Sequence, residues 1–306
     1  MYQQHMSIRP KFASEHAPPL EPVRIKFWGV RGSIPTPGPD TVRFGGNTSC
    51  VEVRADGQII ILDAGSGLRP LGVALDSEFR DQPQELTVLI SHMHWDHIQG
   101  FPFFAPAFHR QNRIRVLGYG GASLGVRDVL SHQMEAPCFP VSLTEMRGNI
   151  AFEELKETRF QVGPIHLSAC RTDHPGACYG YRLDTSGGSI CYVPDSETTM
   201  APSGRHSAGV AELIRDADVV ILDSQYTVEE YSGRVGWGHG CVDEVVQIAR
   251  DAHVKNLYLF HHDPSHDDEF LDKMLQRARG LAIGSGMRVE SAREGEQVLL
   301  GGTIPA

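Results

Sequence analysis

The chain has 306 residues, 41% of them hydrophobic and 22% charged, which fits a folded soluble protein with one large α/β domain or two small ones. The formal net charge of −10 weakens any interpretation that needs a broad surface for binding a polyanion, although a local basic patch is compatible with it. No apolar signal core or membrane-spanning run is present and the six cysteines contain no C-x-x-C pair, so we expect a reducing cytoplasm, free thiols and no membrane partner.

Strand-like runs and helical patterns follow a proline-containing stretch over residues 1–22, which predicts an N-terminal tail or arm. The expected strands cover residues 23–28, 50–54, 58–62, 86–90, 114–117, 165–170, 178–183, 189–193, 219–222 and 257–260. The expected helices cover residues 122–134, 207–216, 242–253 and 267–279. Because strands and helices mix without a dividing linker, we expect residues 23–306 to form a single domain with two sheets and outer helices.

The most informative motif, from His92 to His97, places three histidines and one aspartate within six residues, directly after the apolar run 86–90. Imidazole nitrogens and carboxylate oxygens suit zinc and related divalent metals. In extended geometry the side chains of His92 and His94 project the same way. Asp96 and His97 follow at the start of a turn or helix, where they can face a second metal. The motif therefore predicts a two-metal centre.

A dinuclear centre needs further ligands, which must come from other strand ends. His174, Asp195 and the pair His261 and His262 each come directly after an apolar strand-like run. Each can therefore converge on one edge of the sheets. Adjacent side chains on a strand point oppositely, so only one histidine of the pair can reach the metals.

Together these residues resemble the full ligand set of the metallo-β-lactamase superfamily, and the likeness runs from about residue 23 to residue 300. The resemblance implies that family's fold, an α/β (α+β) four-layer αβ/βα sandwich. It implies that one metal is held by His92, His94 and His174, the second by Asp96, His97 and His261, and that Asp195 bridges them. It favours His261 over His262, because the family ligand lies directly after the strand. The implied cofactors are two divalent ions, with Zn²⁺ favoured and Mn²⁺ or Fe²⁺ accepted by the same ligands.

Two such metals can activate a water and hold the attacking and leaving oxygens, so Asp96 and Asp195 count among the catalytic candidates. Residues 236–240 resemble the region of tRNase Z-type and cyclic-nucleotide phosphodiesterase branches where a histidine before a helix contacts the scissile phosphate. His239 occupies that place, which implies that it binds substrate and assists the leaving oxygen. The alternative is a loop histidine that caps the helix. Asp223 either orients His239 or serves a structural turn.

Residues 31–38, followed by residues 44–50, look like the first-hairpin region of small bacterial phosphodiesterases of this superfamily. The side chains of Asn47, Thr48 and Ser49 offer donors to phosphate oxygens, so we predict that they bind substrate. A tight loop entering a strand explains the same pattern equally well. Asp63 stands where the family keeps an aspartate that supports the metal ligands.

The substrate is narrowed by the short interval from His174 to Asp195, only 21 positions. Short tRNase Z enzymes insert a tRNA-gripping arm there, and this interval reads only as strand, turn and strand. With the acidic net charge, this favours a small phosphodiester, above all a 3′,5′-cyclic nucleotide, and no stable nucleic-acid partner. A tRNase Z-like endoribonuclease and a carbon-centred hydrolase, such as a thioesterase or lactonase, remain as alternatives. The resemblance also suggests a homodimer.

Overall fold

The computed structural model describes residues 22–80, 82–120, 124–197 and 207–300, so all but one residue of the predicted tail lies outside it. Two seven-stranded sheets organise the chain. The first sheet has the spatial order β14 (Gln297–Leu300), β1 (Val23–Gly29), β2 (Cys50–Ala55), β3 (Gln58–Leu62), β4 (Glu85–Ile90), β5 (Arg113–Gly118) and β6 (Asn149–Glu154). The second has the order β13 (Arg288–Ser291), β12 (Asn256–Phe260), β11 (Val219–Asp223), β10 (Gly188–Val193), β9 (Tyr179–Thr185), β8 (Ile165–Arg171) and β7 (Arg159–Val162).

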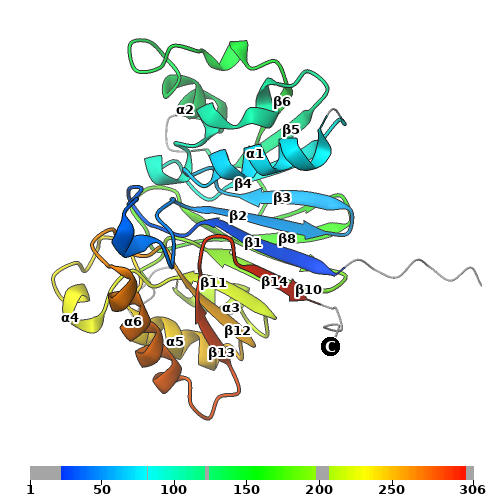
Figure 1. Cartoon of the computed structure of the whole chain (residues 1–306). Coiled ribbons are helices and arrows are strands. Elements are labelled where there is room, and N and C mark those ends of the chain that lie inside the picture. Colours follow the sequence, from blue (N-terminus) through cyan, green and yellow to red (C-terminus); the bar gives the residue numbers. More distant parts are fainter. Residues whose placement is uncertain (1–21, 81, 121–123, 198–206, 301–306) are drawn as a thin grey trace, which may run out of the picture.

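The helices cover the outer faces of the two sheets (Figure 1). The first sheet is covered by α1 (Leu68–Phe79) and α2 (Val126–His132), the second by α3 (Ser207–Leu213), α5 (Val242–Asp251) and α6 (Asp268–Leu281), with α4 (Val228–Tyr231) nearby. Short 3₁₀ helices are η1 (Pro39–Thr41), η2 (Trp95–His97), η3 (Phe101–Phe103), η4 (Ala105–Phe108) and η5 (Leu143–Glu145). A third apolar core fills the space between the sheets. The predicted four-layer αβ/βα sandwich is confirmed.

The strand directions explain why distant residues meet at one edge. Strands β3 to β6 are parallel to one another, and so are β10 to β13. Two antiparallel pairings, β8 with β9 and β9 with β10, give β8 the direction of β10. The segments that follow β4, β8, β10, β11 and β12 can therefore meet at the carboxyl ends of the strands, where ligands bind in such sheets.

The differences from the sequence expectations have physical reasons. The strands at or near the sheet edges, β6, β7, β13 and β14, were not predicted, and β6 and β14 have few buried side chains, so their apolar pattern is weak. Helix α1 was missed because Pro70 and Gly72 interrupt its pattern. The helix expected over residues 122–134 begins only at Val126, where Gly125 is the N-cap. None of the helices in the described ranges is long and apolar enough to cross a membrane.

Candidate metal centre

All seven residues predicted to ligate metals lie together at this edge. They form two adjacent groups: His92, His94, His174 and Asp195 in one, and Asp96, His97 and His261 in the other. Within each group the candidate ligand atoms lie within 4.8 Å of one another. Buried Nε2 atoms of His92 and His97 and the buried Oδ1 of Asp195 have no hydrogen-bond partner among the described residues. Because buried polar atoms need partners, these orphaned atoms fit bound cations.

The first group is arranged around the Oδ2 atom of Asp195. His92 Nε2 lies 3.7 Å from this oxygen and His174 Nε2 lies 3.6 Å from it. Nδ1 of His94 approaches His174 Nε2 to 3.0 Å. His94 therefore faces the group with Nδ1, whereas His92 and His174 face it with Nε2. A cation between the three rings would give each of these nitrogen lone pairs a partner.

The second group faces the other carboxylate oxygen of Asp195. Oδ1 lies 3.1 Å from His97 Nε2 and 3.3 Å from His261 Nε2. The Oδ2 atom of Asp96 lies 3.2 Å and 3.1 Å from the same two nitrogens. Asp195 thus directs one oxygen toward each group, which is the arrangement that a bridging carboxylate requires.

Hydrogen bonds behind the cluster orient its rings. The buried carboxylate of Asp63 faces His97 Nδ1 at 2.7 Å and accepts from Tyr192 Oη at 2.8 Å and from the Ser91 amide at 2.7 Å. A carboxylate on Nδ1 fixes the tautomer in which Nε2 keeps its lone pair for a metal. The structure thus places Asp63 in the supporting position expected for it.

The turn after β12 separates the two adjacent histidines. His261 has a φ of 60°, and its Nε2 faces Asp96 and Asp195. The ring of His262 turns away: it packs edge-on against Phe44, and its Nε2 lies 3.0 Å from the Ala292 carbonyl oxygen. Burial lowers the pKa of His262 to about 3, so this ring is neutral. The structure thus brings His261 into the cluster and leaves His262 outside it.

The loop after β1 packs against His261 and Asp96 of the cluster. A Cβ on Gly32 would lie 2.5 Å from His261 Nδ1, closer than side-chain contacts allow. The amide of Ser33 donates to Asp96 Oδ2 at 2.8 Å. A backbone hydrogen bond holds this loop against the end of β12: Gly32 N donates to the His262 carbonyl at 3.0 Å. Sequence reasoning did not identify this use of Gly32.

The charge states of Asp195 and His92 suit metal binding. Burial would raise the pKa of Asp195, but His261, His97 and His92 hold it well below its usual range. Burial lowers the pKa of His92, which stays neutral and keeps a lone pair. Ionised carboxylates and neutral imidazoles are the forms that coordinate metals. Burial would lower the pKa of His97, but Asp96, Asp195 and Asp63 raise it well above its usual range, so this ring must lose a proton when a cation binds.

His239 stands on the solvent side of the cluster. Its Nδ1 lies 2.9 Å from Asp223 Oδ2 and 3.8 Å from Asp195 Oδ2. Burial would lower the pKa of His239, but the charge and hydrogen bond of Asp223 raise it to about 9. Cations in the cluster would lower this pKa again. The structure fits both roles considered for Asp223, because its Oδ2 faces His239 while its Oδ1 accepts from the Gln225 amide at 3.0 Å in the turn after β11.

The three residues predicted to bind substrate lie in the loop before β2. The side chain of Asn47 donates to Glu294 Oε2 at 3.0 Å and accepts from Ser66 Oγ at 2.9 Å. Thr48 Oγ1 accepts from the Ser66 amide at 2.8 Å, and the buried Ser49 Oγ has no partner among the described residues. These hydrogen bonds connect the loop to Ser66 and Glu294. Contact of Asn47, Thr48 and Ser49 with substrate stays a prediction.

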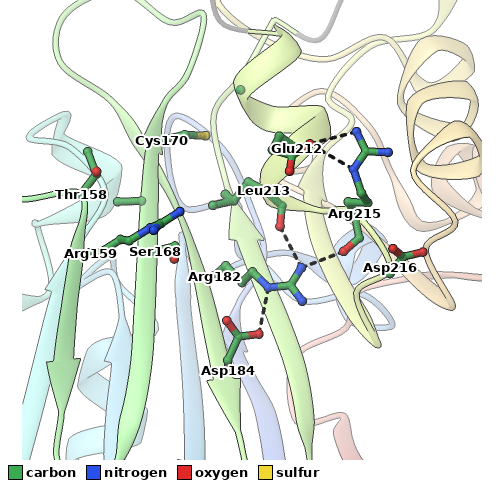
Figure 2. A pocket seen from close by; sticks show the side chains of 12 residues that line it. Thr158, Arg159, Ser168, Cys170, Arg182, Asp184, Glu212, Leu213, Arg215 and Asp216 are labelled. Carbon is green, nitrogen blue, oxygen red and sulfur yellow. Dashed lines mark hydrogen bonds and ion pairs between the residues drawn. The ribbon is translucent and has the colours of Figure 1, made fainter.

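A separate hollow of about 570 Å³ lies on β8 and β9 beside α3, and none of the seven cluster residues lines it (Figure 2). Its central guanidinium, Arg182, bonds to Asp184 Oδ1 at 2.9 Å and to the carbonyls of Leu213 and Arg215 at 3.0 and 2.9 Å. Arg215 pairs with Glu212 at 2.9 Å. The charges of these two arginines are therefore neutralised within the protein, unlike the orphaned atoms of the cluster.

Comparison with known proteins gives a consistent result. A family model described as "Beta-lactamase superfamily domain" matches residues 58–262. Ribonuclease Z of Clostridium kluyveri is 23% identical over 280 residues, which cover 78% of this chain and 87% of that protein. The metallo-β-lactamase fold protein YhfI from Bacillus subtilis superposes with a TM-score of 0.67 at 18% identity, covering 91% of this chain and 99% of that one. A diphosphatase from the PhnP family gives 0.64 at 17%, covering 90% and 97%. At these identities the structural likeness shows the fold alone.

Proposed function

The chain belongs to the β-lactamase superfamily, as a metal-dependent hydrolase, and from this premise we propose that it is a dinuclear phosphodiesterase. Its substrate on this proposal is a small phosphodiester, and we expect a cyclic nucleotide. The observation that carries the proposal is the pair of His239 and Asp223 on the open side of the cluster, with His239 Nδ1 3.8 Å from Asp195 Oδ2. This pair provides a proton donor beside the site where a leaving oxygen needs one.

Each part of the cluster has a role on this proposal. His92, His94 and His174 would hold one cation, Asp96, His97 and His261 the other, and Asp195 would lie between them. Two bound divalent cations, with Zn²⁺ favoured, would supply an activated water and stabilise charge on the phosphoryl oxygens. Asp63 keeps His97 oriented for this task through its bond to Nδ1.

On this proposal, His239 protonates the leaving oxygen. Since Asp223 binds Nδ1, the remaining ring nitrogen, Nε2, is free to donate a proton. The pKa of about 9 keeps the ring largely protonated at neutral pH, and cations nearby would lower that pKa. The imidazolium then gives its Nε2 proton to the leaving alkoxide and regains one from solvent.

The small size of the substrate is argued from the hairpin between His174 and Asp195. A short turn between Thr185 and Gly188 joins strands β9 and β10. Thr185 and Gly188 are paired in the antiparallel ladder. Thr185 Oγ1 donates to the Gly188 carbonyl at 2.6 Å and tightens the turn. This interval therefore holds a short hairpin and no arm for gripping RNA.

A ribonuclease Z-like endonuclease is the second candidate, because the Clostridium kluyveri relative carries that name and spans most of the chain. It shares the whole proposed chemistry and differs only in the size of the substrate. An RNA substrate would have to be held by surfaces other than an arm between β9 and β10.

A turnover panel with defined metals separates the candidates. It contains 3′,5′- and 2′,3′-cyclic nucleotides, precursor tRNA, a thioester and a lactone, each with Zn²⁺, Mn²⁺ or Fe²⁺. We expect hydrolysis of a cyclic nucleotide and close to two metal ions per chain. Cleavage of precursor tRNA without turnover of cyclic nucleotides would replace the first candidate by the second. The cytoplasmic setting, the homodimer and the single domain over residues 23–306 stay predictions.

A further inference from the structure

Glu197 lies two residues after Asp195, and its carboxylate accepts hydrogen bonds from the last residue of α4 and from the loop that follows this helix. Its Oε1 and Oε2 accept from the Gly236 amide at 2.9 and 2.8 Å, and Oε2 also accepts from the Gly238 amide at 3.1 Å. Oε1 accepts in addition from Tyr231 Oη at 2.7 Å. The side chain is 9% exposed, so these donors surround a largely buried charge. Neither the sequence motifs nor the metal cluster gives this carboxylate a role.

The geometry of the loop shows why an anion stands there. Gly236 and Gly238 have φ values of 86° and 87°, a region that favours glycine. Both amides point to the same carboxylate, and backbone amides that converge in this way attract an anion. Without an acceptor, the buried Gly238 amide would lack a hydrogen-bond partner, which is unfavourable.

The same loop contacts two functional histidines. The Gly238 carbonyl lies 2.9 Å from His174 Nδ1, so it fixes the tautomer that leaves His174 Nε2 for the cluster. A Cβ on Gly238 would lie 2.5 Å from His174 Nδ1, which shows how tightly backbone and ring are packed. The next residue is His239, which faces Asp223. A shift of Gly238 would therefore move both rings.

We propose that Glu197 is the positioning residue of the loop 236–239: by binding the Gly236 and Gly238 amides, it sets the orientation of His174 and His239. This inference rests on the proposed function and deepens it by adding a residue on which the leaving-group step depends. Glu197 touches no substrate on this proposal. It acts only through the backbone of the loop.

The test is Glu197→Gln in the full, metal-loaded chain, because glutamine keeps the size of the side chain but replaces one acceptor oxygen by a donor. We expect kcat to fall between about 10- and 100-fold, as small misplacements of catalytic groups do, with little change in KM or metal content. The fall should be larger for an alkyl than for a nitrophenyl phosphodiester, because only the alkoxide needs His239. Glu197→Asp, which keeps the charge, should recover part of the loss. Glu229→Gln, an exposed carboxylate on α4, serves as the matched control and should behave as wild type.

Imidazole N–H resonances give a readout that does not depend on turnover. We expect Glu197→Gln to shift the resonance of His174 Nδ1–H and to speed its exchange with solvent, while Glu229→Gln leaves it unchanged. An unchanged resonance together with unchanged kcat would overturn the inference. So would an equal loss of kcat for both substrates with an unchanged His174 resonance, since neither histidine would then depend on Glu197. If Glu197→Gln does not fold, the same readouts on Glu197→Asp decide. Absence of phosphodiesterase activity in the wild type would instead reject the proposed function, and the resonances would still test the role of Glu197.

Discussion

The two sides of the metal cluster differ in how they meet solvent. On the inner side His97, His261 and Asp195 are 0%, 1% and 1% exposed, and the rings are held by Asp63 and by the backbone at Gly32. On the outer side His94 is exposed and His239 keeps contact with solvent. The difference separates two tasks, because buried ligands hold cations in place whereas a substrate can approach only from the outer side. Inner substitutions should therefore cost metal and activity together, whereas substitution of His239, which is not one of the seven predicted ligands, should cost activity alone.

The largest effect is expected for Asp96→Asn on the inner side. Amide nitrogen cannot replace the Oδ2 atom that approaches His97 and His261, so the second group loses its only carboxylate besides Asp195. Hydrolysis should fall by more than about 100-fold, since even residues behind a metal ligand are worth 10–100-fold. Metal content per chain, measured by mass spectrometry, should fall toward one. Asp40→Asn, an exposed aspartate in η1, is the control; wild-type turnover in Asp96→Asn would show that the site is misassigned.

A smaller loss on the same side is expected for Gly32→Ala. The added methyl group would lie 2.5 Å from His261 Nδ1 and would push the ring from the cluster. We expect a loss of activity of about 10–100-fold together with weaker binding of one metal. Gly38→Ala is the matched control, because its φ of 173° is ordinary extended backbone and nothing lies within 4 Å of its Cβ position. If the two variants behave alike, the packing of Gly32 on His261 has no functional weight.

On the outer side, His239→Ala should leave the metal content unchanged. The loss of kcat should be large for alkyl leaving groups and small for aryl ones, because only the former need a proton. In the wild type the protonated ring is the donor, so activity should decline as pH rises through the pKa of His239, which is about 9 without cations and lower with them. That alkaline decline should be absent from the variant. Equal losses for both kinds of substrate would contradict leaving-group assistance and blur the separation of the two sides.

What could be predicted from the sequence depended on distance along the chain. The cluster from His92 to His97 is a local motif, and its geometry follows from the end of one strand. The family resemblance favoured His261 over His262, and the turn after β12 gives the physical reason, because the positive φ of His261 decides which ring faces the cluster. Gly32 and Glu197 act through contacts with residues far away in the sequence, so no local pattern announced them.

A local pattern also leaves out partners that only the fold supplies. Asn47 and Thr48 look like free donors in the sequence, yet their side chains bond to Glu294 and Ser66, which come from elsewhere in the chain. Hydrogen-bond partners of this kind cannot be read from one segment. The strands β6 and β14 show the same limit for the fold, since a strand at a sheet edge leaves a weak apolar signal.

The cluster also joins the two halves of the sandwich. His92, His94 and His97 follow β4 of the first sheet, whereas His174, Asp195 and His261 follow strands of the second. Any cation bound here is therefore a cross-link between the sheets, and the bond from Tyr192 to Asp63 crosses the same interface. Folding and metal supply become linked quantities: each tenfold rise in free metal above its dissociation constant should add about 1.4 kcal/mol per bound ion to the free energy of unfolding. A chain made in a metal-poor cell would then be less active and also shorter-lived.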